Sequence, residues 1–149
     1  MIVDEHREVA RLKDVVPVFS KTLPVVEISA EDTVLELNLY ENDAVGQLLK
    51  QLPQTLVMTR WGDGAYGGSL SGKIEITDGK REKRNAFFKG EVVIRQKRNS
   101  LFLMFGATPA ALTVDEPMLS GGIPVGRLKD YSALKHLSGV VEFSIKVRK

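Results

Sequence analysis

Short segments in which apolar and polar residues alternate recur along nearly the whole chain, and they constrain the fold more than any other feature. Residues 34–40 place Leu35, Leu37 and Leu39 between polar residues, and residues 141–147 repeat this pattern. A period of two is typical of a strand with one buried face. About eight strands are predicted, without regular alternation between strand and helix. This favours a closed antiparallel barrel, because closure removes the edges that so many strands would otherwise expose.

The other predicted strands are short and are separated by turn signals. Residues 25–28 form a hairpin with residues 34–40 through a turn at residues 29–32. Residues 100–105 are apolar on both faces, which indicates a central strand packed on two sides. Further strands are predicted at residues 55–61, 74–76, 87–88, 91–95 and 141–147, with an irregular extended segment over residues 118–128.

Two helices are predicted to cap the barrel. The first spans residues 43–52, with Asn42 or Asp43 as its N-cap and Pro53 as its stop. The second is a short helix that begins at Asp130 and carries Tyr131, Leu134 and Leu137. A helical turn over residues 5–16 is also predicted within an N-terminal extension, residues 1–22, which precedes the barrel domain of residues 23–149.

Composition excludes several kinds of chemistry. The length of 149 residues corresponds to one domain. The absence of cysteine excludes thiol nucleophiles, disulfides and iron–sulfur clusters. Its two histidines, His6 and His136, fit no metal-ligand spacing, and neither a metal nor a cofactor is predicted. Residues 1–8 lack the basic and then apolar character of a secretory signal, so we expect a cytoplasmic protein.

Charge and hydropathy argue against nucleic-acid and membrane partners. A net charge of +2 is too small to indicate phosphate binding, and no apolar stretch reaches the length of a membrane span. Two basic clusters, residues 80–84 and residues 95–98, lie near turn signals, and solvated loop charge is the simplest interpretation of both.

Residues 59–68 hold the only tryptophan of the chain together with four glycines. Arg60 shares a strand face with apolar residues, so its side chain either extends to solvent or points into a pocket. Trp61 either packs in the core or presents its ring to a ligand. The residues predicted to bind a ligand come from this segment and from three later strand segments: Arg60, Trp61, Tyr66, Arg95, Phe102, Phe105 and Ser120.

Six features in order resemble the cyclophilin-like family of small bacterial and archaeal proteins, whose activity is unassigned. They are the hairpin, the helix ending in Leu-Pro, Trp61-Gly62 with Tyr66 downstream, Lys89-Gly90-Glu91-Val92, the strand followed by Gly106-Ala107-Thr108-Pro109, and the segment from Ser120 to Leu128. The resemblance covers residues 23–149 and implies an eight-stranded closed barrel with a helix at each end. Residues 94–99 depart from the aromatic and proline-rich turn that the family usually has there.

The resemblance leaves three functions open. True cyclophilins isomerise X-Pro bonds with an arginine above an aromatic floor, but this chain has neither a Phe-His-Arg strand nor a Gln-Gly-Gly segment after Phe102 or Phe105. We therefore expect a binding module for a small molecule or peptide. Isomerisation by Arg60 or Arg95 over Trp61, Phe102 or Phe105 is the enzymatic alternative. The third is a structural role in a homo-oligomer, with residues 1–22 docked on a neighbouring subunit.

Overall fold

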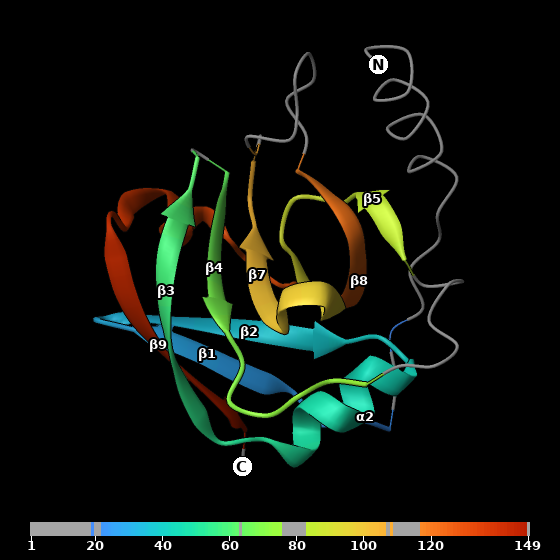
Figure 1. Ribbon diagram of the computed structural model, residues 1–149. Helices are drawn as coiled ribbons and strands as arrows, with labels where there is room; N and C mark the ends of the chain where they lie inside the picture. Colours follow the sequence, from blue (N-terminus) through green and yellow to red (C-terminus); the bar gives the residue numbers. More distant parts are fainter. Residues whose placement is uncertain are drawn as a thin grey trace.

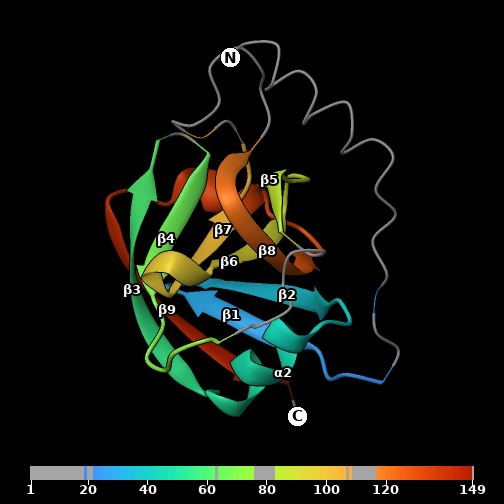
Figure 2. The same ribbon diagram turned by 45° about the vertical axis from the view of Figure 1, so that its right-hand side comes forward.

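Eight antiparallel strands close into a barrel, as the sequence predicted (Figure 1). The computed structural model describes residues 19, 22–62, 64–75, 83–106, 108 and 117–148. The strands are β1 Val26–Ala30, β2 Thr33–Leu39, β3 Gln54–Trp61, β4 Ala65–Ser69, β5 Arg84–Ala86, β6 Glu91–Arg95, β7 Ser100–Met104, β8 Met118–Leu128 and β9 Val140–Val147. Around the barrel their order is β2-β1-β9-β3-β4-β7-β6-β8, and the short β5 adds to β8 (Figure 2).

Pairing between β2 and β8 closes the barrel. Leu37 lies opposite Leu128, and Leu39 lies opposite Gly126, in this antiparallel ladder. A Cβ atom added to Gly126 would collide with the backbone carbonyl of Asn38 and would crowd the Leu37 side chain. Closure at this position therefore requires a glycine.

The inward side chains of the strands form one apolar core. In β2 and β9 every second residue is buried, so the alternation seen in the sequence divides each strand into an inner and an outer face. Tyr66, Phe105 and Phe143 are the aromatic members of this core, and the remainder is mostly aliphatic. Burial of this apolar surface is the main favourable contribution to folding.

One end of the barrel is closed by α2, Asp43–Lys50, and by residues 70–75, which are hydrogen-bonded to Gln47 and Gln51. The side chain of Asn42 caps the helix by accepting a hydrogen bond from the Val45 amide at 3.1 Å. Ile74 is fully buried, and its amide donates to the Asn99 side chain at 2.8 Å instead of joining a strand ladder. The predicted strand at residues 74–76 is therefore wrong at residues 74 and 75, and residue 76 lies outside the described residues.

The predicted second helix is a 3-10 helix, η2 Ser132–His136, and not an α-helix. Leu134 and Leu137 are buried, and their spacing of three residues matches the three residues per turn of a 3-10 helix. Asp130 begins the turn by accepting a hydrogen bond from the Ser132 amide at 2.9 Å. In the described part of the chain, α2 is thus the one helix of seven or more residues.

The sequence analysis missed β4, and its predicted strand at residues 87–88 is wrong. Residues 65–69 form β4 although their glycines disfavour strands, and Phe87 and Phe88 lie outside the strands although their type favours them. Tertiary packing overrides local propensity in both places. The predicted helical turn at residues 5–16 lies outside the described residues. Of the extension at residues 1–22, Phe19 and Thr22 are described, and Phe19 forms an isolated bridge with Tyr40.

Replacement of Gly126 by alanine tests the close approach at the β2–β8 seam. We expect Gly126→Ala to lower the free energy of unfolding by about 2–3 kcal/mol, because the added methyl group overpacks a site with no space. Gly46 of α2 is the matched control, since a Cβ atom there meets nothing within 4 Å. Gly46→Ala should raise stability by about 0.5–1 kcal/mol. Equal effects in urea unfolding would contradict a steric limit at the seam.

Glu36 is expected to make a pH-dependent contribution to the free energy of unfolding. Its carboxylate accepts a hydrogen bond from Arg148 at 2.6 Å. This bond holds the pKa of Glu36 below its ordinary value of 4.5. Because the pKa is lower in the folded state, the contribution is present above the ordinary value and is lost as the pH falls through the lowered value. In an NMR titration, Arg148→Ala should raise the Glu36 pKa towards its ordinary value. An unchanged pKa would show that the hydrogen bond is absent in solution.

Candidate functional site

Strand alternation divides the predicted binding residues between the two sides of the barrel wall. Tyr66 and Phe105 belong to the inner core, and Arg60 follows Leu56 and Met58 on the inner face of β3. Trp61 and Phe102 pack against a second apolar cluster on the outer face, and Arg95 shares that face because its neighbour Ile94 points inward. Ser120 lies in β8, and its side chain is outside the described part.

Arg60 ties the end of β3 to the η2 end of the barrel. Its Nη1 atom donates to the carbonyl of Leu137 at 2.6 Å, and its Nε atom donates to the carbonyl of Gly62 at 3.2 Å. The guanidinium carbon lies 5.3 Å from the centre of the Phe105 ring and 5.7 Å from that of Tyr66. These contacts are intramolecular and assign Arg60 a structural role.

Tyr66 is fully buried beneath this arginine. Its ring lies edge-on to Phe143 at 5.6 Å and 6.0 Å from Phe105. Its hydroxyl group has no hydrogen-bond partner among the described residues. A buried hydroxyl without a partner opposes folding, so Tyr66 contributes through its ring alone.

The outer wall presents two half-buried aromatic rings, Trp61 and Phe102, whose centres are 5.5 Å apart and whose planes are tilted by 56°. Gly67 makes this arrangement possible. A Cβ atom on Gly67 would lie 2.6 Å from the Phe102 ring, so the ring rests directly on the backbone of β4. Ala65 and Met104 pack below the two aromatic side chains. We call the exposed side of Trp61 and Phe102 the outer aromatic surface.

An apolar row extends from this surface across neighbouring strands. The register of the sheet aligns Val140, Thr59, Gly67, Phe102 and Val93 on the outer face. Val140 is 67% exposed, whereas Val93 is buried. The row is therefore open to solvent at the β9 side and becomes covered at the β6 side.

A second row of outward residues lies below the first. It consists of Ser69, Ser100 and Arg95, which are adjacent in the β4–β7–β6 register. Arg95 is diagonal to Phe102, because Phe102 lies opposite Val93. Diagonal positions in an antiparallel sheet are about 7–8 Å apart, within reach of a long side chain. Arg95 therefore lies one diagonal step from Phe102, whereas Trp61 lies on the other side of Phe102, in the row of Ala65 and Met104.

A buried ionic cluster next to the second apolar cluster was missed in the sequence, and its Arg84 lies over the ring of Phe87, a member of that apolar cluster, at 5.3 Å. Glu91 is fully buried, and its carboxylate accepts hydrogen bonds from Arg84 at 2.6 Å, from the Tyr40 hydroxyl at 2.9 Å and from the Phe88 amide at 2.7 Å. Arg127 stacks on the Phe88 ring at 5.0 Å. The signal available in the sequence was the glutamate of the Lys-Gly-Glu-Val segment, at the start of an otherwise apolar strand.

Burial, followed by the charge of Glu91, raises the pKa of Tyr40 far above its ordinary value. The Tyr40 hydroxyl therefore remains a hydrogen-bond donor at neutral pH. Because the described groups satisfy both oxygens of Glu91, the cluster anchors β5 and β6 to the end of β2. Its geometry supports a structural role.

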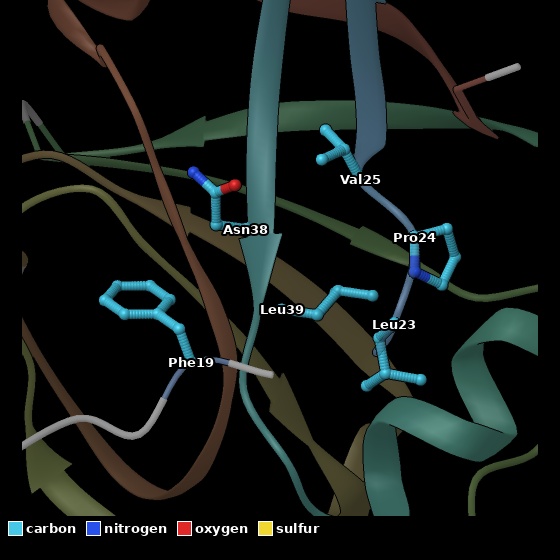
Figure 3. A pocket seen from close by; sticks show the side chains of 6 residues that line it. All are labelled: Phe19, Leu23, Pro24, Val25, Asn38 and Leu39. Carbon is cyan, nitrogen blue, oxygen red and sulfur yellow. The ribbon is translucent and has the colours of Figure 1, made fainter. Parts of the chain in front are cut away.

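Two hollows on the surface lie away from the outer aromatic surface. One has a volume of about 210 Å³ and is lined by side chains that include Phe19, Pro24 and Asn38. Figure 3 shows Phe19 on one side of this hollow and Pro24 on the other. The second, of about 570 Å³, lies beside Pro53 and Lys146. Neither is lined by a residue of the predicted binding set.

Among the described residues, no group of three or more histidine or acidic side chains is arranged to hold a metal ion. No helix in the described part combines the length and apolar character required to cross a membrane.

The closed barrel, with α2 across one end as the one α-helix of the described residues, has the architecture of a cyclophilin-like barrel protein. The chain belongs to the cyclophilin-like family, whose model matches residues 28–146. Its structure is similar to the solution structure of a hypothetical protein from Archaeoglobus fulgidus, with a TM-score of 0.71 and 20% identity over 89% of this chain and 98% of that chain. At this identity the similarity shows the fold alone. No curated protein matches the sequence significantly.

The unpaired Tyr66 hydroxyl leads to a stability prediction with an internal control. Tyr66→Phe should raise the free energy of unfolding by about 1 kcal/mol, because it removes a buried group without a partner. Tyr40→Phe should lower it by about 1.5–3 kcal/mol, because it removes a hydrogen bond to a buried carboxylate. Urea unfolding measures both. A similar loss in the two variants would show that the Tyr66 hydroxyl has a partner in solution.

Proposed function

We propose that this protein is a binding module that holds a peptide segment by an apolar side chain on the outer aromatic surface. The observation that carries the proposal is the pair Trp61 and Phe102, half-buried on the outer wall and fixed above Gly67. Aromatic side chains offer a large contact area at a small cost in conformational entropy, and they are enriched where proteins bind one another.

Rigid support favours recognition at this surface. Both rings project from strands and pack on a buried cluster that includes Ala65 and Met104, so little ordering is required when a ligand binds. Thr59 and Val140 extend the surface across β3 and β9 and provide exposed contact area for the neighbouring residues of a peptide. Binding would therefore follow the cross-strand row.

Peptidyl-prolyl isomerisation is a second candidate, supported by the shared face of Arg95 and Phe102. An arginine that donates to the amide nitrogen of an X-Pro bond, with the proline ring on an aromatic floor, would lower the barrier of about 18–20 kcal/mol. The contacts of Arg60 with Leu137 and Gly62 favour Arg95 over Arg60 for this role. A protease-coupled proline peptide assay decides this candidate, which requires an acceleration that Arg95→Ala removes.

The binding proposal is testable because Trp61 is the only tryptophan of the chain and lies in the surface itself. Titration with short peptides that contain leucine, phenylalanine or proline should change its fluorescence and reach saturation. Thr59→Lys places a long charged side chain beside Phe102 and should weaken this binding at least about tenfold, or about 1.4 kcal/mol.

Thr55→Lys is the matched control, because Thr55 is exposed on the same face of β3 but lies four residues away. It should bind the peptides as the natural protein does. The proposal fails if no peptide changes the Trp61 fluorescence, or if the two lysine variants weaken binding equally.

A further inference from the structure

Arg95 differs from the other half-buried arginines of the described chain. The side chains of Arg60, Arg84 and Arg127 each donate at least one hydrogen bond to a carbonyl or carboxylate oxygen. The Arg95 side chain makes no hydrogen bond or ion pair with any described residue, although it is half-buried beside Ser100. A guanidinium carries five N–H donors and a fixed charge, which makes it well suited to bind a carboxylate.

The surroundings of Arg95 are basic, and Glu91, the acidic residue on the same face of β6, has both carboxylate oxygens occupied by Arg84, Tyr40 and Phe88. Lys97 and Arg98 follow it in the exposed turn η1 Gln96–Arg98, which lies at the lower end of β7 in Figure 1. The four ion pairs between described residues are elsewhere, and residues 92–114 contain no aspartate or glutamate. The outward positions of β3, β4 and β7 are also free of acidic residues: Thr55, Val57, Thr59, Trp61, Ala65, Gly67, Ser69, Ser100, Phe102 and Met104.

The position of Arg95 on a strand changes the interpretation of this basic cluster. The sequence suggested solvated loop charge, and Lys97 and Arg98 fit that description. Arg95 instead projects from the same wall as Phe102, one diagonal step away. Because the Phe102 ring lies over Gly67, a peptide that contacts both the ring and Arg95 crosses from β4 to β6, about 10 Å. An extended peptide advances about 3.3 Å per residue, so a carboxylate two or three residues from the apolar side chain is within reach of the long Arg95 side chain.

We propose that the outer aromatic surface selects acidic peptides, with an apolar side chain on Trp61 and Phe102 and a neighbouring aspartate or glutamate paired with Arg95. This inference rests on the proposed function and specifies its ligand. Lys97 and Arg98 add long-range attraction, which increases the association rate and decreases with salt. The carboxylate supplies the charge that no described residue offers to Arg95.

The arrangement favours a peptide over a single-stranded nucleic acid. Binding of successive bases uses separate aromatic platforms along a basic groove. Here the two rings pack on each other at 5.5 Å, and the three cations are grouped at one end of the surface. One apolar side chain and a nearby acid match this layout.

The test compares two acetylated, amidated hexapeptides, Ala-Glu-Leu-Pro-Glu-Ala and Ala-Gln-Leu-Pro-Gln-Ala, by Trp61 fluorescence. The acidic peptide should bind about tenfold more tightly at low salt, and roughly 0.5 M salt should reduce this preference. Arg95→Gln should reduce the ratio of the two affinities to about one, and Arg95→Lys should restore part of it. Lys146→Gln, which removes an exposed charge on β9, should retain the full preference.

The outcomes separate this inference from the proposed function. If both peptides bind equally and Arg95→Gln leaves their ratio unchanged, the acidic specificity is wrong and the binding proposal stands. If neither peptide binds, both proposals fail. A short oligothymidylate is also tested as a competitor of the acidic peptide. If it binds more tightly than the peptide, the acidic-peptide assignment is wrong and the ligand is a nucleic acid. Circular dichroism spectra that match the natural protein confirm that each variant is folded.

Discussion

The structure depends on the close approach of β2 and β8, where Gly126 leaves room for the backbone of Asn38. This seam removes the last two free edges of the eight-stranded sheet and divides every strand into an inner and an outer face. The inner face is filled by one apolar core, and α2 and the turn η2 close its two ends. Each side chain then acquires its role from the face on which it lies.

This division separates two arginines that look equivalent in the sequence. Arg60 lies on the inner side and donates hydrogen bonds to the carbonyls of Leu137 and Gly62. The bond to Leu137 links β3 to the turn after β8. Arg95 lies on the outer side without a partner among the described residues. Recognition needs an accessible and unsatisfied group, so the outer wall is where binding is to be sought.

The buried pair of Glu91 and Arg84 stabilises the wall in a different way. A buried ion pair seldom adds much net stability, but removal of one partner is costly because a charge is left without compensation. The Tyr40 hydroxyl and the Phe88 amide complete the hydrogen bonding of Glu91. The cluster therefore ties β5 to β6 and to Tyr40 at the end of β2.

Local sequence patterns determined most of the secondary structure and the fold class of this protein. Alternation predicted most strands, the Asn42 cap and the leucines of residues 43–52 predicted α2, and the order of motifs predicted the cyclophilin-like barrel. Tertiary structure decided the rest. Residues 65–69 form a strand because they pair with β3 and β7, where Gly67 leaves room for the Phe102 ring, and the buried Glu91 accepts a hydrogen bond from Tyr40, which is 51 residues away. Neither contact is encoded by neighbours along the chain, since both depend on which strands lie side by side after closure.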